Sequence, residues 1–390
     1  MEYWFVVGGR ALARAGVVVG LVIVSMVGVY APAGAAPTWS LVGTAPGALY
    51  GQVAAVSCPA PAACIAVGTL DLAHSVSRLA ERWDGTKWTA LSTPNPTGAI
   101  SSQLTSVKCS STTSCIAVGQ YNTLAAVTKT LAMRWDGKRW SIMSTPNAPG
   151  SAVSVLTGVA CASSTSCFAV GSFFVSTMDT SNTLTLVERW NGTTWSIVAS
   201  PNQPLALDSA LTSVTCASTT FCFAVGSYDT QLVTSTLAER WDGTAWSIVS
   251  TPNPSGSPDS ELLGVTCTST SNCFAVGLGH STLIERWNGT IWGIVTSANP
   301  AGATGASLTS VSCPSPTRCV AVGTVFRQNV VQRLLETWNG TGWSIVNVPL
   351  PSGTKASSLS GVSCSTTTSC FAAGYFRLGP TRRPLFERYS

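Results

Sequence analysis

The chain has 390 residues, of which only 9% are charged, and its formal net charge is +5 at pH 7. Nucleic-acid-binding proteins gather Lys and Arg along one face or one segment. No run of basic residues occurs here, so we expect no nucleic-acid partner.

The first 36 residues show the features of an export signal in the expected order. Arg10 and Arg14 precede an uncharged apolar stretch, and small residues follow at 33–36, where a signal peptidase would cleave. We therefore expect residues 1–36 to be a signal peptide and the remaining chain to be secreted. The alternative is a retained membrane anchor with the rest of the chain facing outward, because residues 15–36 are long enough to span a bilayer.

All fourteen cysteines fall into seven pairs that share the spacing C-x5-C. An even count with uniform spacing in an exported chain favours local disulfides. Thiolate metal sites would favour C-x2-C spacing or nearby histidines, and the chain contains only His74 and His280. We expect no metal and no other cofactor. The expected disulfides are Cys58–Cys64, Cys109–Cys115, Cys161–Cys167, Cys216–Cys222, Cys267–Cys273, Cys313–Cys319 and Cys364–Cys370.

The cysteine pairs mark an internal repeat. Successive first cysteines are separated by 51, 52, 55, 51, 46 and 51 residues, so the chain is an array of seven units. Residues 211–256 show the pattern of one unit: two short runs rich in β-branched residues flank a Cys loop, and two more flank an Asp-Gly turn at Asp242. Four runs separated by turn residues predict a four-stranded antiparallel meander.

The two ends of the chain are complementary fragments of one unit. Residues 359–389 supply three runs and then stop, whereas residues 38–42 resemble a fourth run without the other three. Each unit has two apolar faces that only neighbouring units can bury, and joining the ends completes the seventh unit. The predicted fold is therefore all-β: a seven-bladed β-propeller with four antiparallel strands and one disulfide in each blade. The propeller domain spans residues 37–390, and residues 37–46 form the outer strand of the last blade.

The pattern resembles the kelch, WD40 and Asp-box families of propellers. It is most similar to the secreted bacterial propellers of the galactose-oxidase/kelch-like type, many of which have no known function. The resemblance covers residues 38–390 and is one of architecture, since the adjacent glycine pair of kelch blades is absent and the Trp-Asp-Gly-Thr-x-Trp turn lacks the spacing residue of an Asp-box. It implies the fold and no particular activity.

Two aromatic residues flank the third turn of each unit, as Trp241 and Trp246 do, and a Glu-Arg pair such as Glu239 and Arg240 usually precedes them. The aromatic residues could be sugar-stacking platforms, one per blade. We favour the interpretation that they fill the space between blades and fix the hairpin register. Adjacent strand residues point to opposite faces, so the Glu and the Arg should each face a neighbouring blade in a structural role.

The loops between the second and third runs lie, with the Pro-rich linkers, at the end of the meander opposite the Cys loops. We call this end the variable-loop face, because its loops range from five residues at 278–282 to fourteen at 172–185. Variable loops on a rigid scaffold commonly carry specificity. The candidate binding residues are aromatic residues and arginines of this face: Tyr121, Phe173, Phe174, Tyr228, Phe326, Arg327, Arg333, Tyr375, Arg377, Arg382 and Arg383.

The sequence supports three functional hypotheses. The first is an extracellular, non-catalytic and monomeric binding scaffold whose variable-loop face holds a polysaccharide or an acidic protein partner, since arginines gather on the sixth and seventh units. The second is a multivalent glycan-binding lectin with equivalent sites between blades. The third is an extracellular hydrolase or lyase with its site at the channel mouth, for which Asp71, Asp179 and Asp229 are the main carboxylate candidates. No nucleophile or phosphate-binding motif is apparent, so no catalytic residue is assigned.

Overall fold

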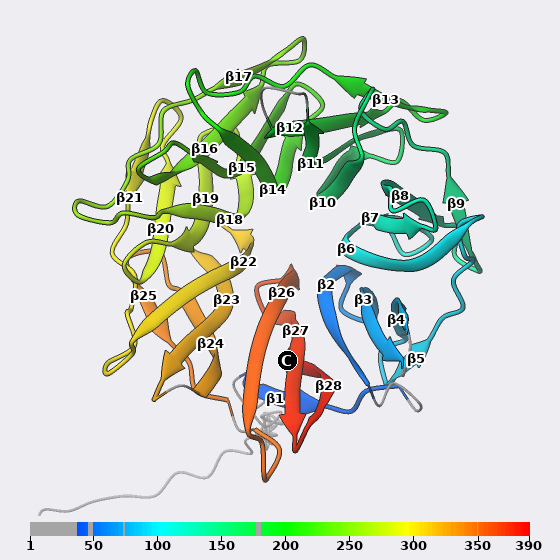
Figure 1. The fold of residues 1–390 in the computed structure, drawn as a ribbon. Coiled ribbons are helices and arrows are strands. Elements are labelled where there is room, and N and C mark those ends of the chain that lie inside the picture. Colours follow the sequence, from blue (N-terminus) through cyan, green and yellow to red (C-terminus); the bar gives the residue numbers. More distant parts are fainter. Residues whose placement is uncertain (1–36, 46–49, 73–74, 177–180, 329, 349) are drawn as a thin grey trace, which may run out of the picture. The chain divides into compact units, whose positions relative to one another are not determined.

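Seven groups of four antiparallel strands surround a central axis, as Figure 1 shows for residues 37–390. The computed structural model describes residues 37–45, 50–72, 75–176, 181–328, 330–348 and 350–390, and these contain strands but no helix. The predicted all-β, seven-bladed propeller is therefore confirmed. The expected signal segment 1–36, His74 and Asp179 lie outside the described residues.

The strands of each blade follow one another from the centre outward (Figure 1). Blade 1 contains β2 (Gly51–Ala60), β3 (Ala63–Leu72), β4 (Ser75–Trp83) and β5 (Trp88–Ala90). Blade 2 contains β6 (Ala99–Ser111), β7 (Ser114–Thr123), β8 (Thr128–Trp135) and β9 (Trp140–Met143). Blade 3 contains β10 (Val153–Ser163), β11 (Ser166–Ser176), β12 (Ser181–Trp190) and β13 (Trp195–Val198). Blades 4 and 5 contain β14 (Asp208–Ser218), β15 (Phe221–Asp229), β16 (Thr234–Trp241) and β17 (Trp246–Ile248); and β18 (Glu261–Ser269), β19 (Asn272–Leu278), β20 (Thr282–Trp287) and β21 (Trp292–Ile294). Blades 6 and 7 contain β22 (Gly305–Ser315), β23 (Arg318–Arg327), β24 (Val330–Trp338) and β25 (Trp343–Ile345); and β26 (Ala356–Thr366), β27 (Ser369–Leu378), β28 (Thr381–Tyr389) and β1 (Trp39–Val42).

The N-terminal strand completes the last blade. β1 pairs antiparallel with β28, with Trp39 opposite Tyr389, and the innermost strands of blades 7 and 1 lie side by side (Figure 1). The predicted closure by complementary ends is confirmed. The strand itself covers Trp39–Val42 and not the whole of residues 37–46, because the chain has turned toward blade 1 by Ala45, whose N–H donates to Glu81.

The first three strands of each blade are longer than the predicted runs of about five residues. β6 has 13 residues, and β11 and β12 have 11 and 10. The segments expected to be variable loops are rich in aromatic and β-branched residues, which favour strands, and they continue the ladder: Phe174 pairs with Thr183. Most of the predicted loop 172–185 is therefore a β-hairpin, and the variable-loop face consists largely of strand ends.

Each first hairpin contains a bulge, with a glycine of the second strand beside it. In blade 4 the register shifts between Leu211 and Ser213, and Gly226 pairs with Leu211. A Cβ on Gly226 would lie 1.9 Å from the main-chain oxygen of Ala210. No side chain fits there, so the close approach of the two strands requires glycine.

The third turn is built by its Asp or Asn. The N–H of Ala245, together with the hydroxyl and N–H of Thr244, donates to Asp242 Oδ1, and these bonds lower the pKa of Asp242 to about 2. Gly243 supplies the positive φ of 107°. Asn191 accepts the corresponding bond from the Thr193 N–H at 2.9 Å, so turn geometry explains the Asn-Gly-Thr sequences.

The aromatic pairs fill the spaces between blades. Trp287 and Trp292 of blade 5 are 2% and 4% exposed, and their ring centroids lie 5.1 and 5.0 Å from that of Phe223 of blade 4. Phe371 of blade 7 contacts the pair of blade 1 in the same way, across the closure. Around the ring, each pair packs on the residue that follows the second cysteine of the preceding blade. The predicted packing role is confirmed.

All seven predicted disulfides are formed, and no cysteine is free. Each joins the first strand of its blade to the second. Disulfides at this density are typical of proteins that fold in an oxidising, extracellular environment. Within the described part of the chain, no helix has the length and apolar character needed to cross a membrane.

Candidate functional site

The candidate binding residues lie on paired strands near the variable-loop face and not in free loops. The structure distributes the aromatic candidates over blades 2, 3, 4, 6 and 7 but brings the five arginines together on blades 6 and 7, which are neighbours in the ring (Figure 1). These arginines lie on β23, β24, β27 and β28. The basic candidates are therefore confined to two neighbouring blades, and the aromatic candidates are not.

Three of the six candidate aromatic residues pack on the cores between blades. Tyr121, Phe173 and Tyr228 are half-buried and contact the hydrophobic clusters of their blade interfaces. Phe326 differs, since it is 43% exposed. The six tryptophan pairs are buried, so their faces are not available for stacking on a sugar.

Arg333 forms a buried ion pair and does not extend into solvent. Its side chain is 11% exposed, and its Nε donates to Glu387 of blade 7, which is fully buried. Desolvation raises the pKa of Glu387, and the Arg333 guanidinium opposes that rise. Among the described residues, Nη2 of Arg333 has no partner. Arg333 thus joins blade 6 to blade 7, and its unpaired Nη2 is itself buried.

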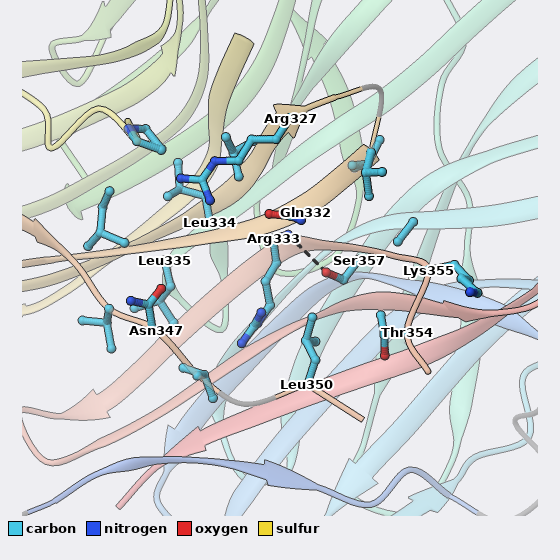
Figure 2. Close-up of a pocket in the computed structure, with 18 residues that line it drawn as sticks. Arg327, Gln332, Arg333, Leu334, Leu335, Asn347, Leu350, Thr354, Lys355 and Ser357 are labelled. Atoms are coloured by element: carbon cyan, nitrogen blue, oxygen red, sulfur yellow. Dashed lines mark hydrogen bonds between the residues drawn. The ribbon is translucent and has the colours of Figure 1, made fainter. Parts of the chain in front are cut away.

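A cavity of about 250 Å³ lies beside this ion pair, where blade 6 meets the linker to blade 7 (Figure 2). Arg327 and Arg333 lie on opposite sides of β24, and Lys355, just before β26, forms another part of the wall (Figure 2). Leu335 and Leu350 contribute apolar surface. Three of the described residues that line the cavity are cationic and none is acidic.

Lys355 was missed by the sequence analysis, which considered only the segments between second and third strands on these two blades. Its position in a Pro-rich linker could have indicated it, because these linkers lie on the variable-loop face. Its N–H donates to the Arg377 carbonyl at 2.9 Å, which fixes the linker against β27.

A second hollow lies on the other side of the β27–β28 hairpin, toward blade 1. Arg377 and Arg382 are direct cross-strand neighbours and line it together with Tyr50 and Asp71. The guanidinium carbon of Arg382 lies 4.9 Å from the ring centroid of Tyr375, in a cation–π contact. Like charges directly opposite each other destabilise a sheet, so the arginine pair does not contribute to the stability of the hairpin.

Six glutamates of the Glu-Arg repeat are completely buried: Glu81, Glu188, Glu239, Glu285, Glu336 and Glu387. They point toward the preceding blade, as Glu239 does by accepting a hydrogen bond of 2.9 Å from Ser200 Oγ. Burial raises the pKa of Glu188, Glu239 and Glu285 to about 8. Shifts of this size often mark catalytic groups, but these have no access to solvent and recur around the ring, which supports a structural role.

Blade 2 departs from this pattern, because Met133 occupies the position of the glutamate. Arg78 faces blade 2 from blade 1, is 5% exposed and donates to three neutral acceptors. Arg333 holds the equivalent position on blade 6 and has Glu387 as its partner. Among the described residues, Arg78 is therefore a buried cation that is hydrogen-bonded to neutral groups and forms no ion pair.

The carboxylates considered for a hydrolase are not brought together. Asp71 lies on blade 1, whereas Asp229 lies on blade 4 and accepts a hydrogen bond from Thr234. His280 is exposed, and its Nε2 contacts the Gly256 carbonyl. Across the described ranges, no group of three or more His, Cys, Asp or Glu residues is arranged to hold a metal ion.

Solved structures of low sequence identity share this fold. YCF48 from Cyanidioschyzon merolae is similar with a TM-score of 0.54 and 13% identity, over 90% of this chain and 98% of that one. The GH74 xyloglucanase from Xanthomonas campestris is similar with a TM-score of 0.52 and 14% identity, over 90% of this chain and 55% of the enzyme. At these identities the likeness shows the fold alone. No protein-family model matches the chain, and no curated protein matches it in sequence.

Proposed function

We propose that this propeller is an extracellular, non-catalytic binding protein that holds an acidic polysaccharide on blades 6 and 7. The binding surface flanks the β27–β28 hairpin, and we name it the basic hairpin surface. Its residues are Arg327, Arg333, Lys355, Arg377, Arg382 and Arg383. The observation that carries the proposal is the cavity of about 250 Å³ whose described lining includes three cations and no acid.

The charge distribution supports a polyanionic ligand. Six of the chain's 21 basic residues lie on this one surface, while only 9% of the whole chain is charged. Two acidic residues lie close to these basic residues. Glu387 is paired with Arg333, and Asp71 lines the second hollow. A concentrated positive potential raises the local concentration of an anionic ligand and speeds its association.

The form of the surface supports an extended ligand. The two hollows lie on opposite sides of one hairpin, so a ligand with carboxylate or sulfate groups at repeated intervals can contact both. Phe326 is 43% exposed and lies on the opposite face of β23 from Arg327, so it offers a flat apolar contact for a sugar ring outside the cavity. The strands that hold these side chains are anchored by blade packing and disulfides, so little conformational entropy of the main chain is lost on binding.

Calorimetry with alginate, an acidic polysaccharide, tests the proposal. We expect binding that weakens as salt increases, because surface charges are screened. The double variant Arg327→Gln/Lys355→Gln should weaken binding at least tenfold. The matched control, Lys138→Gln/Arg139→Gln, removes the same charge from an exposed turn on the opposite face and should bind as the unmodified protein does. Absence of alginate binding, or an equal loss in both double variants, would contradict the proposal.

A further inference from the structure

The central channel contains a cavity of about 240 Å³ that is lined by the first strands of all seven blades. Most of its wall is Ser and Thr with main-chain atoms. Lys108 of β6 is the one charged residue among the described residues that line it. This cavity lies on the axis of the ring and shares no residue with the basic hairpin surface.

Serine oxygens in the wall accept main-chain N–H groups of the next blade. Ser106 Oγ accepts from the Val159 N–H at 3.2 Å, and Ser57 Oγ accepts from the Cys109 N–H at 3.0 Å. Four more serines do the same: Ser213, Ser310, Ser312 and Ser363. Within the described part of the chain, none of these six hydroxyls donates to a protein acceptor. A hydroxyl has one donor and two acceptor sites, so six O–H donors remain for a ligand or water.

Lys108 replaces one of the small residues of this wall. The equivalent position, directly before the first cysteine, is small in the other six blades: Ser57, Ala160, Thr215, Thr266, Ser312 and Ser363. An ammonium group cannot accept the bond that Ser57 accepts, so blade 2 gives up that contact with blade 3. Lys108 forms no ion pair with any described residue. Water reaches the side chain through the channel, yet the surrounding wall lowers the pKa of Lys108 by desolvation.

We propose that the channel binds a small oxyanion, held by the Lys108 ammonium and by serine hydroxyls of several blades. The described lining offers one cation, six O–H donors and no carboxylate, so a ligand that only accepts hydrogen bonds and carries negative charge complements it. Inorganic phosphate and sulfate have acceptor oxygens in four directions, which matches donors that converge from around a ring. Such a ligand also pairs with an ammonium group that forms no ion pair with any described residue.

Thermal unfolding of the disulfide-bonded chain in chloride tests this, with phosphate or sulfate added at constant ionic strength. A ligand that binds only the folded state stabilises it, so above the dissociation constant we expect the melting temperature to rise with the logarithm of the anion concentration, by about 4 °C at 100 times the dissociation constant. The separate phosphate and sulfate series identify which oxyanion is preferred. Lys108→Ser introduces the serine that blades 1, 6 and 7 have at this position, so it should fold at least as well in chloride and lose the rise.

Two further measurements separate this site from the proposed function. Lys355→Ser, on the basic hairpin surface, should keep the rise caused by phosphate. Crystals soaked in selenate should show anomalous scattering beside Lys108 Nζ in the unmodified protein and none there in Lys108→Ser. The proposal is overturned if neither anion raises the melting temperature, if Lys108→Ser retains the full rise, or if selenate is found only outside the channel.

Discussion

Glu285 is the buried acid with the least compensation. Within the described residues, neither of its carboxylate oxygens has a hydrogen-bond partner, and burial raises its pKa from 4.5 to about 8. Between these two values the folded protein keeps a proton that the unfolded chain has released. The contribution of Glu285 to the free energy of unfolding is therefore greatest below pH 4.5 and falls as the pH rises to about 8.

Glu285→Gln should make stability less dependent on pH. Glutamine keeps the shape of the protonated acid and cannot ionise, so the variant should melt as the unmodified protein does at about pH 5. At about pH 8.5 it should be more stable, by on the order of 1–3 kcal/mol. Circular dichroism during heating measures both.

Glu387→Gln is the matched control for this prediction. It removes the partner of Arg333 and leaves a buried guanidinium uncompensated, so it should lower the melting temperature at both pH values. If Glu285→Gln is no more stable than the unmodified protein at about pH 8.5, then burial does not raise the pKa of Glu285 in the folded state.

The alternation of side chains along a strand was enough to predict that these glutamates face a neighbouring blade. Their partners were not predictable, because each comes from another unit of the repeat. Ser200 and Glu239 are 39 residues apart and meet only after blades 3 and 4 have packed. The Arg333–Glu387 pair was missed for the same reason, and Arg333 was interpreted as a free binding residue.

At the level of the strand, the first hairpin of each blade depends on the glycine beside its bulge. Gly226→Ala should destabilise the protein by roughly 3 kcal/mol or more, because the new methyl group would meet the main-chain oxygen of Ala210 and neither strand can move without breaking its ladder. Urea unfolding followed by tryptophan fluorescence measures the loss.

Gly293→Ala provides the control within the same fold. Gly293 lies in β21, at the position where most blades have serine, and an added Cβ would have nothing within 4 Å. Its replacement should leave the protein equally stable or slightly more stable, since alanine restricts the unfolded chain. A similar loss for both variants would show that close approach at the bulge is not the cause.

The order of the strands was predictable from turn residues, but their lengths were not. Asp-Gly and Cys-loop signals fix where a hairpin turns at one end of a blade. At the other end, segments such as Phe173 to Ser176 were interpreted as loop because they vary between units, although their aromatic and β-branched residues allow pairing to continue. The candidate residues on these segments are therefore held more rigidly than loops would hold them.

For the whole molecule, the ring was predictable because it follows from counting: seven units, with the missing strand of the last unit at the other end of the chain. The cavity between blades 6 and 7 was not, since its wall combines β23, β24, a linker and β26, and only folding brings these together. The channel site was missed too, because Lys108 is unusual only in comparison with the equivalent residues of six other blades.

The closed ring places every surface discussed above, and it rests on the pairing of β1 with β28. Comparing the melting temperatures of chains that begin at Thr38 and at Gly43 tests this pairing directly, since only the second chain lacks Trp39 and Val42. The ring centroid of Trp39 lies 5.6 Å from that of Tyr389, and Val42 packs on the core between blades 7 and 1. We predict that the shorter chain melts several degrees lower and that the β28 amides lose their protection from hydrogen exchange. Identical melting temperatures and unchanged protection would contradict the closed ring.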